Sequence, residues 1–359
     1  MTALQPDTSR QLREDWKKRS LLAVLVLGLL IFGLLRQQAA KVEHFYGHTM
    51  GTTYQISYVP ANDVHSIAYL QSQVEQTLDT LVDSMSTYES NSEISRFNAS
   101  ALNEWFLLSN AMADVVAEAI VISKQSNGRF DPTIGPLVSV WGVQQAVGTA
   151  VFTPPEELKI SAALTQVGYQ HLVFDAVGQK LQKRKDIHLD LSAIAKGYAV
   201  DRIAVQLQEF GVDSFLVEIG GEVYAKGLKP SGQAWRVAIE EPKPEARVVN
   251  HIIELDGRAI ASSGDYRNYV SYQGQLFGHI LDPTTGYPVS HQLYSVTVVH
   301  PSAMTADGWA TAMSVLGAEE GLRLADELGL AVLFLMDQAG QIEASWSQAF
   351  EPYRVFSES

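Results

Sequence analysis

Cysteine is absent from the chain of 359 residues. Its absence excludes disulfide bonds, thiolate metal sites, cysteine nucleophiles and iron–sulfur clusters, and also a lipid-bearing cysteine at the N-terminus. It does not indicate a compartment, because a chain of this length can bury a core without covalent cross-links. Hydrophobic residues make up 46% of the chain and charged residues 18%, so the composition is that of a globular protein.

Four familiar signatures of nucleotide-binding and hydrolytic proteins are also missing. The chain has no G-x-G-x-x-G after a predicted strand, no G-x-x-x-x-G-K-[ST], no H-E-x-x-H and no G-x-S-x-G. The usual dinucleotide-binding fold, the P-loop, the zincin site and the serine hydrolase site therefore lose support. Any nucleotide must be held in another way.

Basic residues are few outside the N-terminus. The first 41 residues hold seven of the 26 Lys/Arg and three of the 40 Asp/Glu, which leaves 19 and 37 in the remainder. This body therefore carries a net charge of −18. It would repel nucleic acid, so we expect no nucleic-acid partner. For the same reason it would need a cation to hold a polyphosphate.

The N-terminus combines a basic flank with an apolar run. Basic residues between Arg13 and Arg19 precede residues 20–35, and these sixteen residues would span about 24 Å as a helix, short of the ~30 Å hydrocarbon core. No A-x-A cleavage site follows. We expect residues 20–36 to form a transmembrane anchor or an uncleaved signal in a bacterial inner membrane, with residues 1–19 in the cytoplasm and the body in the periplasm.

Hydrophobic periodicity predicts strands and helices that do not alternate in regular βαβ units. Hairpin-like strand pairs dominate the second half of the chain. We therefore expect an α+β fold with mixed, largely antiparallel sheets and packed helices, preceded by the N-terminal membrane helix. The expected strands are 52–58, 172–174, 187–191, 214–219, 235–239, 252–255, 259–262, 294–300 and 330–336, and the expected helices are 66–85, 111–123, 192–210, 306–316 and 323–328.

Asp307 and Thr311 lie four residues apart in a predicted helix, so their side chains share one face. A carboxylate and a hydroxyl suit Mg²⁺, which takes few protein ligands and completes its shell with phosphate or water. The alternative is an aspartate early in a helix that complements the helix dipole, beside an incidental threonine. Spacing alone favours that alternative.

Residues 190–197 run from a predicted strand into a predicted helix. The N–H groups and the positive dipole end of such a helix suit an anion, and Lys196 could add charge to a phosphate. In the alternative interpretation, Asp190 or Ser192 only caps the helix and Lys196 is solvated. The residues themselves leave both interpretations open.

Two loops contain further candidate residues. Residues 126–137 are punctuated by glycine and proline, and they could present backbone groups and an aromatic edge to a flat ring, or form an ordinary surface turn. His279 lies at the end of a strand and is a candidate general base, although a single histidine is more often a structural hydrogen bonder. The residues after it, 282–286, have good turn chemistry.

Taken in order along the chain, these and neighbouring segments closely resemble the ApbE family of FAD:protein FMN transferases. The resemblance runs from about Phe45 to the C-terminus, so residues 45–359 are identified as a flavin transferase catalytic domain. It rests on eight segments: Met50 to Tyr54; Ser86 to Tyr88 with Ser92 to Asn98; Gly128 to Leu137; Asp190 to Gly197; Glu218 to Glu222; Ser262 to Tyr266; His279 to Pro288; and Thr305 to Thr311.

The resemblance implies a Mg²⁺-dependent reaction with FAD as substrate. FMN would pass to a Thr or Ser hydroxyl of an acceptor protein as a phosphoester, and AMP would leave. Mg²⁺ would be held by Asp307, the Thr311 hydroxyl and the main-chain oxygen of Ala193, and His279 corresponds to a histidine with a suspected catalytic role. The implied contacts with FAD are Met50, Tyr88, Arg129, Phe130, Asp131, Asp190, Lys196 and Leu281.

Two departures and two alternatives accompany this resemblance. Many members of the family carry a lipidated cysteine, which this chain lacks, and Ala193 offers no side-chain ligand. The same metal site would serve a pyrophosphatase that splits FAD into FMN and AMP with water as nucleophile. A non-catalytic flavin-binding protein is the other alternative. As acceptor, the resemblance implies a membrane subunit of an electron-transfer complex.

Overall fold

The computed structural model describes residues 41–60, 65–146, 152–243, 246–264, 269–290, 293–338 and 341–354. None of the helices in these ranges is both long enough and apolar enough to cross a membrane. The anchor predicted at residues 20–36 lies outside the described residues, so it stays a prediction.

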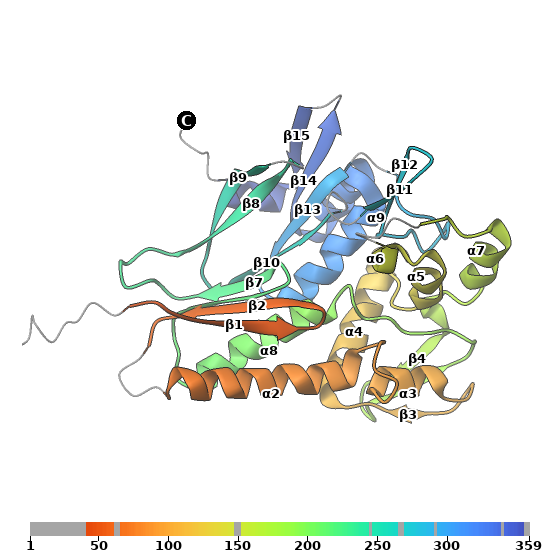
Figure 1. Cartoon of the computed structure of the whole chain (residues 1–359), viewed down its shortest axis with the longest axis horizontal. Coiled ribbons are helices and arrows are strands. Elements are labelled where there is room, and N and C mark those ends of the chain that lie inside the picture. The colour runs from red at the N-terminus through yellow and green to blue at the C-terminus, as the bar shows by residue number, and fades with distance from the viewer. Residues whose placement is uncertain are drawn as a thin grey trace, which may run out of the picture. The chain divides into compact units, whose positions relative to one another are not determined.

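An antiparallel sheet of eight strands is the centre of the fold (Figure 1). Every neighbouring pair in it is antiparallel, which confirms the α+β prediction. The strands in sheet order are β1 (Glu43–Thr49), β2 (Thr52–Tyr58), β6 (Phe215–Ile219), β7 (Glu222–Lys226), β10 (Arg258–Ser263), β13 (Leu293–His300), β14 (Ala331–Gln338) and β15 (Gln341–Trp346).

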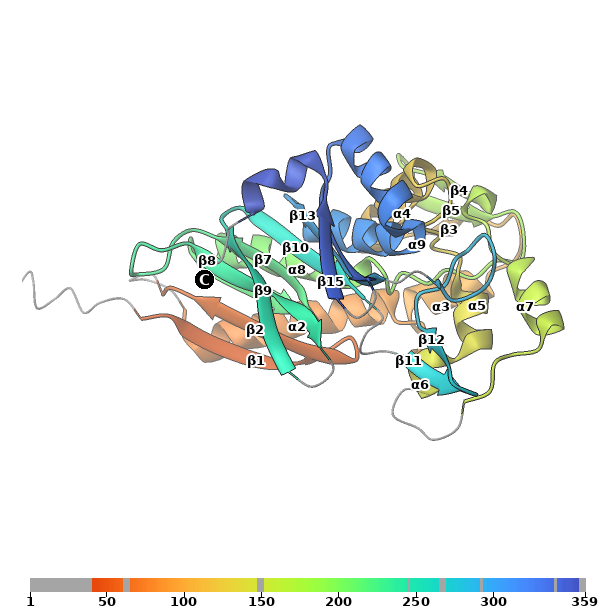
Figure 2. The same cartoon turned by 90° about the horizontal axis from the view of Figure 1, so that it is seen from above.

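Three smaller sheets and a set of helices surround this sheet (Figures 1 and 2). The sheets are β3 (Phe106–Leu107) with β5 (Lys180–Lys183) and β4 (Leu172–Asp175), β8 (Trp235–Lys243) with β9 (Ala246–Leu255), and β11 (Tyr269–Tyr272) with β12 (Gln275–Gly278). The α-helices are α2 (Ile67–Met85), α3 (Glu93–Ala99), α4 (Asn110–Gln125), α5 (Gly135–Trp141), α6 (Val143–Ala146), α7 (Glu157–Leu164), α8 (Ala195–Glu209) and α9 (Ala303–Leu328), and two 3₁₀ helices cover Tyr169–His171 and Gln348–Tyr353.

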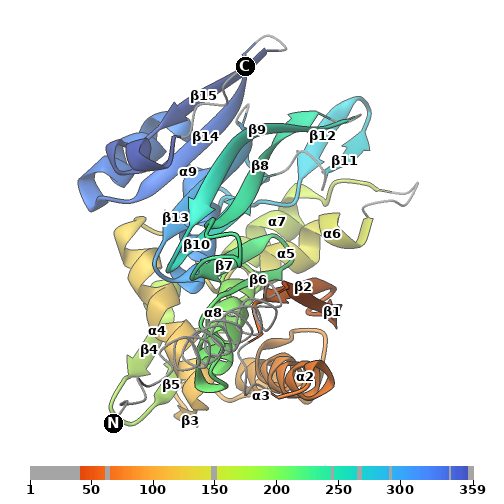
Figure 3. The same ribbon diagram turned by 90° about the vertical axis from the view of Figure 1, so that its left-hand side faces the viewer.

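The two faces of the large sheet bury different cores because side chains alternate along a strand. In β10, Ala259 and Ala261 belong to the core shared with the helices, whereas Ile260 faces the core under β8 and β9. In β13, Val298 belongs to the core shared with the helices and Val299 faces the core under β8 and β9. Figure 3 shows helices α2, α4 and α8 together below the sheet. The sheet is therefore buried on both faces and forms a rigid base for the loops at its ends.

Helices α8 and α9 are held together at the N-terminus of α9. Both carboxylate oxygens of Asp201, in α8, accept hydrogen bonds there: Oδ1 from the Ala303 amide at 2.8 Å, and Oδ2 from the Ser302 hydroxyl at 2.7 Å and the Met304 amide at 3.0 Å. These bonds satisfy donors that a helix start leaves without partners. They also fix the position of the start of α9 relative to α8.

A glycine allows the two helices to approach closely. A Cβ atom at Gly197 would overlap the carbonyl oxygen of Ala303 and lie 2.8 Å from the Cβ of Asp307. The first turn of α8 therefore packs directly against the backbone of α9, and Asp307 lies over it.

Most predicted elements have the expected type, and three expectations are wrong in detail. Residues 187–191 are not a strand: His188 forms only an isolated bridge with Ile134. The helix expected over 192–210 begins at Ala195. The helices expected at 306–316 and 323–328 are one helix, α9, kinked at Gly317, where φ is 79°.

The first of these errors has a local physical cause. Residues 187, 189 and 191 are apolar and fully buried, which is the pattern of a strand. The amide and carbonyl of Leu189, however, are bonded by the side chain of Asn98, at 2.7 and 3.0 Å. A side chain thus takes the place of a neighbouring strand, and the sequence pattern alone does not reveal it.

We predict that Gly197→Ala destabilises the fold. Alanine has the higher helix propensity, by up to ~1 kcal/mol, but the overlap with α9 should reverse the sign and cost about 1–3 kcal/mol. Urea unfolding of the full chain measures this difference. Val205→Ala, on the same helix at a position 40% exposed, is the matched control and should change stability by less than about 0.5 kcal/mol. An unfolding free energy for Gly197→Ala equal to that of the unsubstituted chain would contradict this packing.

Candidate active site

A cavity of about 270 Å³ brings together the segments that the sequence analysis singled out. It lies at the N-terminal ends of α8 and α9 and is also lined by the turns after β6, β10 and β12. Ten of the twelve predicted site residues line it: Arg129, Phe130, Asp131, Asp190, Ala193, Lys196, His279, Leu281, Asp307 and Thr311.

The other two predicted residues, Met50 and Tyr88, line a second cavity of about 570 Å³. Met50 lies in the two-residue turn between β1 and β2, where its φ of 48° is in the left-handed region. Tyr88 follows α2 and is 75% exposed. Ser192 and Lys196 line both cavities. The two cavities therefore adjoin, and the start of α8 lies between them.

Asp307 is a buried acidic group of the first cavity, with 4% of its side chain exposed. Its Oδ2 accepts a hydrogen bond from the amide of Gly197 at 3.0 Å. Its Oδ1 lies 3.6 Å from Nζ of Lys196, which is an ion pair but too long for a hydrogen bond. The bond from Gly197 to Oδ2 thus positions the carboxylate, and Oδ1 faces the Lys196 ammonium.

Glu222 is a second buried carboxylate at this site, and the residue predictions did not include it. Its Oε1 lies 2.8 Å from Nζ of Lys196, and 4% of its side chain is exposed. Among the described residues, its buried Oε2 has no hydrogen-bond partner. The carboxyl groups of Glu222 and Asp307 thus both face the one ammonium of Lys196. The sequence signal was its place after Gly220 and Gly221 in a segment of the family resemblance.

Burial and charge shift the pKa values of this cluster in one direction. Burial raises the pKa of Glu222 well above its usual range, and the Asp307 carboxylate raises it further, against the opposing effect of the Lys196 ammonium. Burial alone would lower the pKa of Lys196, but the carboxylates of Asp307 and Glu222 outweigh it and raise that pKa. Lys196 is therefore charged at neutral pH, and the cluster favours additional positive charge.

Thr311 lies one helical turn after Asp307, as its spacing predicts. Its hydroxyl is 3.4 Å from the hydroxyl of Ser263, at the end of β10. Ser263 also lines the cavity and is a second polar group that the residue predictions did not include. A neighbouring pair, Ser262 and Thr297, bonds across β10 and β13 at 2.8 Å.

The hydrogen bonding of the Ala193 main-chain oxygen depends on where α8 begins. In a regular helix the amide of Gly197 would bond to this oxygen. Here that amide bonds to Asp307 instead, and α8 begins only at Ala195. The Gly197 amide therefore does not take the Ala193 carbonyl as its acceptor, and Ala193 lines the cavity.

These oxygen atoms fit a small, hard cation. No group of three or more histidine, aspartate or glutamate side chains in the described ranges could hold a metal ion. A cation must therefore take oxygens of several kinds: a carboxylate, a hydroxyl and a carbonyl, with its shell completed by water or phosphate. Mg²⁺ tolerates such a set, and softer metals that prefer nitrogen or sulfur do not. The unpartnered Oε2 of Glu222 is consistent with a cavity built for positive charge.

The loop of residues 126–137 is braced by its own side chains. The Ser126 hydroxyl accepts a bond from the Phe130 amide at 3.1 Å. Asp131 uses both of its oxygens within the protein, accepting from Thr133 and from the amide of Tyr169. Burial raises the pKa of Asp131, and these bonds oppose the rise. Its carboxylate therefore holds the loop, and the ring of Phe130 is buried behind it.

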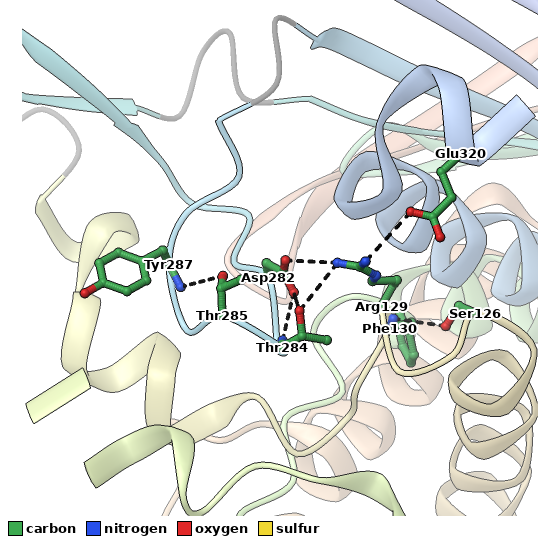
Figure 4. A network of polar contacts seen from close by, with 8 residues as sticks. All are labelled: Ser126, Arg129, Phe130, Asp282, Thr284, Thr285, Tyr287 and Glu320. Atoms are coloured by element: carbon green, nitrogen blue, oxygen red, sulfur yellow. Dashed lines mark hydrogen bonds and ion pairs between the residues drawn. The ribbon is translucent and has the colours of Figure 1, made fainter. Parts of the chain in front are cut away.

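Arg129 connects three elements at the rim of the cavity (Figure 4). Its guanidinium lies 3.1 Å from Asp282, in the turn after β12, and 3.7 Å from Glu320, beyond the kink in α9. It also donates to the hydroxyl of Thr284 at 3.4 Å. The turn that follows His279 is thereby fixed to the loop and to α9.

Asp190 bonds locally but does not cap α8, because the N-cap position is Ile194 and has no side-chain hydrogen bond. Its Oδ1 accepts from the amide and the hydroxyl of Ser192, at 2.9 and 2.5 Å.

His279 and Leu281 follow β12, and Leu281 pairs with Pro288 in the turn. His279 lines the same cavity as Asp307 and Thr311, although it follows β12 and the other two belong to α9.

The fold and the cavity define a class: an antiparallel α+β protein with one oxygen-rich site where α8 meets α9. A family model described as "ApbE family" matches residues 50–334, and this chain belongs to that family. The resemblance found in the sequence is thus confirmed.

Relatives of known sequence and structure cover nearly the whole described body. The FAD:protein FMN transferase of Vibrio cholerae is 40% identical over 336 residues, 93% of this chain and 99% of its own length. That of Salmonella typhimurium is 38% identical over 86% of this chain and 88% of its own length. The apo structure of Pseudomonas stutzeri flavinyl transferase ApbE superposes with a TM-score of 0.80 at 40% identity, over 88% of this chain and 97% of that one. The prediction that the chain is an enzyme of the transferase class is confirmed.

We predict that Asn98→Ala disturbs the segment before α8. It removes two hydrogen bonds to the backbone of Leu189 and leaves buried polar groups unsatisfied, at about 1–3 kcal/mol each. The melting temperature of the full chain should fall, together with its affinity for FAD. Asn110→Ala, which loses only an exposed side-chain bond to Gln179, is the control and should change neither. Equal melting temperatures for the two variants would refute this role of Asn98.

Proposed function

We propose that the protein transfers FMN from FAD to a Thr or Ser hydroxyl of an acceptor protein, with Mg²⁺ bound and AMP released. The observation that carries this proposal is the cluster of Asp307, Glu222 and Lys196 in the first cavity, in which Lys196 also lines the adjoining second cavity. The names of the relatives, FAD:protein FMN transferase, give the direction of the reaction.

FAD has two ring systems joined by a diphosphate, and the site has two cavities joined at Ser192 and Lys196. We place the diphosphate at this junction, where the Lys196 ammonium and the start of α8 attract negative charge. Mg²⁺ would be held by Asp307, the Thr311 hydroxyl and the Ala193 carbonyl. When bound, it would neutralise the diphosphate and stabilise the charge that develops on the leaving AMP.

The acceptor hydroxyl needs a base and a fixed position. In the proposed step, its oxygen bonds to the phosphorus of the FMN half, the bond from that phosphorus to the bridging oxygen breaks, and AMP carries the electron pair away. His279 takes the hydroxyl proton. Arg129 keeps the turn after His279 in place through Asp282, so that the base stays at the cavity.

The surroundings of the enzyme follow from the same proposal. We infer that residues 20–36 anchor the protein in a bacterial inner membrane and that the catalytic domain faces the periplasm. The acceptor would then be a membrane subunit of an electron-transfer complex. The motivation is the basic and apolar N-terminal pattern. Protease protection in spheroplasts tests it: digestion of the catalytic domain only after the inner membrane is opened would contradict it.

The direct test is mass spectrometry of an acceptor protein. The purified full chain, FAD, Mg²⁺ and an acceptor should give a product heavier by FMN less one water, at a Thr or Ser, with one AMP released per transfer. No covalent flavin on the acceptor would refute the proposal. Rapid release of AMP that an acceptor does not increase would favour the pyrophosphatase, and tight FAD binding without turnover would favour a flavin-binding protein.

Asp307→Asn separates the charge of Asp307 from its structural role. The amide oxygen can still accept from Gly197, so the melting temperature should stay close to that of the unsubstituted chain. Loss of the carboxylate charge should lower kcat/KM about 10²–10³-fold, the range seen when one group that stabilises transition-state charge is removed. Asp337→Asn, in β14, is the control. Undiminished turnover in Asp307→Asn would refute the metal-site assignment.

A further inference from the structure

The Lys196 ammonium lies between two buried carboxylates but not midway between them. Its distance to Glu222 Oε1 is 2.8 Å, a charge-assisted hydrogen bond, and its distance to Asp307 Oδ1 is 3.6 Å. Glu222 is therefore its principal partner. As a result, Oδ1 of Asp307 is left without a hydrogen bond from this lysine.

Glu222 is held in place by the backbone of the sheet. It is the first residue of β7, directly after the turn at Gly220 and Gly221, where φ is 62° and 104°. The stem of Lys196 passes over this turn: a Cβ atom at Gly220 would lie 3.3 Å from its Cδ. The carboxylate thus comes from a rigid strand, whereas the lysine that it binds has a flexible stem.

Removing the charge of Glu222 would change the partner of the lysine. Asp307 would then be the one carboxylate described within ion-pair distance of the ammonium. Burial makes such a pair strong, because little water screens it. This ion pair would oppose the entry of a divalent cation beside Asp307.

We propose that Glu222 is a positioning residue that holds the Lys196 ammonium off Asp307, so that Asp307 Oδ1 stays available to a divalent cation. This inference rests on the proposed function, in which Asp307 binds Mg²⁺. It explains why Glu222, which is not among the predicted ligands, is buried in the same cavity. It also explains how Lys196 can lie beside a cation site without occupying Asp307 Oδ1.

One other role for Glu222 has to be distinguished. Its Oε2 is buried and has no hydrogen-bond partner among the described residues, so it could itself be a metal ligand. A direct ligand and a positioning residue both weaken metal binding when they are replaced. They differ in whether removal of the Lys196 charge restores it.

The test measures Mn²⁺ binding to the purified full chain in the absence of FAD, by electron paramagnetic resonance of the unbound ion. Mn²⁺ takes oxygen sites like those of Mg²⁺. Asp307→Ala first identifies the binding that belongs to this site. The variants are E222Q, K196M and the double variant, each checked for folding by circular dichroism. All three keep side-chain length close to the original.

We expect E222Q to raise the dissociation constant for Mn²⁺ at least tenfold, about 1.4 kcal/mol. K196M should bind no more weakly than the unsubstituted chain. The double variant should bind within about threefold of K196M, because the competing ammonium is gone. Unchanged binding in E222Q would overturn the inference. A double variant that binds Mn²⁺ as weakly as E222Q would also overturn it, because Glu222 would then be a metal ligand. A loss of Mn²⁺ affinity in K196M would overturn it as well, and this can be measured even if E222Q does not fold.

Failure of the proposed function gives a different result. If Mn²⁺ binding to the unsubstituted chain does not depend on Asp307, the metal site itself is refuted, and the role of Glu222 with it. If that binding depends on Asp307 but E222Q leaves it unchanged, only the role of Glu222 is refuted.

Discussion

The hydrogen bond from the Gly197 amide to Asp307 determines the geometry of the whole site. It joins the first turn of α8 to α9 at 3.0 Å, and it requires both the missing side chain of Gly197 and the brace that Asp201 forms at the start of α9. The same bond diverts the Gly197 amide from the Ala193 carbonyl. One contact between two helices thus orients a carboxylate and keeps the Gly197 amide off the Ala193 carbonyl.

Electrostatics explains why this arrangement suits a metal-dependent reaction on a diphosphate. The body of the protein is strongly acidic, and the cavity adds two buried carboxylates against one ammonium. A diphosphate alone would be repelled, and a cation alone would be attracted. Binding of the two together removes the conflict, because each supplies the charge that the other lacks. In the proposed function, the acidity of the site is therefore a reason for requiring a cation rather than an obstacle to binding FAD.

The sequence predicted the type of fold, and ten of the twelve residues that it singled out line one cavity, but it did not predict the contacts between them. Periodicity was sufficient for α2 and for parts of both β8 and β9, because their patterns are local. It failed at residues 187–191, where Asn98 replaces a strand partner from 91 residues away. The i, i+4 spacing of Asp307 and Thr311 predicted that they share a helix face. Spacing could not show that Gly197 and Lys196 contact Asp307 on that face. Glu222 was missed as a site residue because its importance depends on a contact between β7 and α8, which no local pattern encodes.

Reciprocal binding of FAD and Mg²⁺ tests the central claim, that the cation and the diphosphate need each other at this site. The measurement is the dissociation constant of FAD for the full chain, by calorimetry, with Mg²⁺ and with EDTA, and that of Mg²⁺ with and without FAD. We expect Mg²⁺ to tighten FAD binding at least tenfold, about 1.4 kcal/mol of coupling, and FAD to tighten Mg²⁺ binding by the same factor. An FAD dissociation constant that is the same with Mg²⁺ and with EDTA would contradict it.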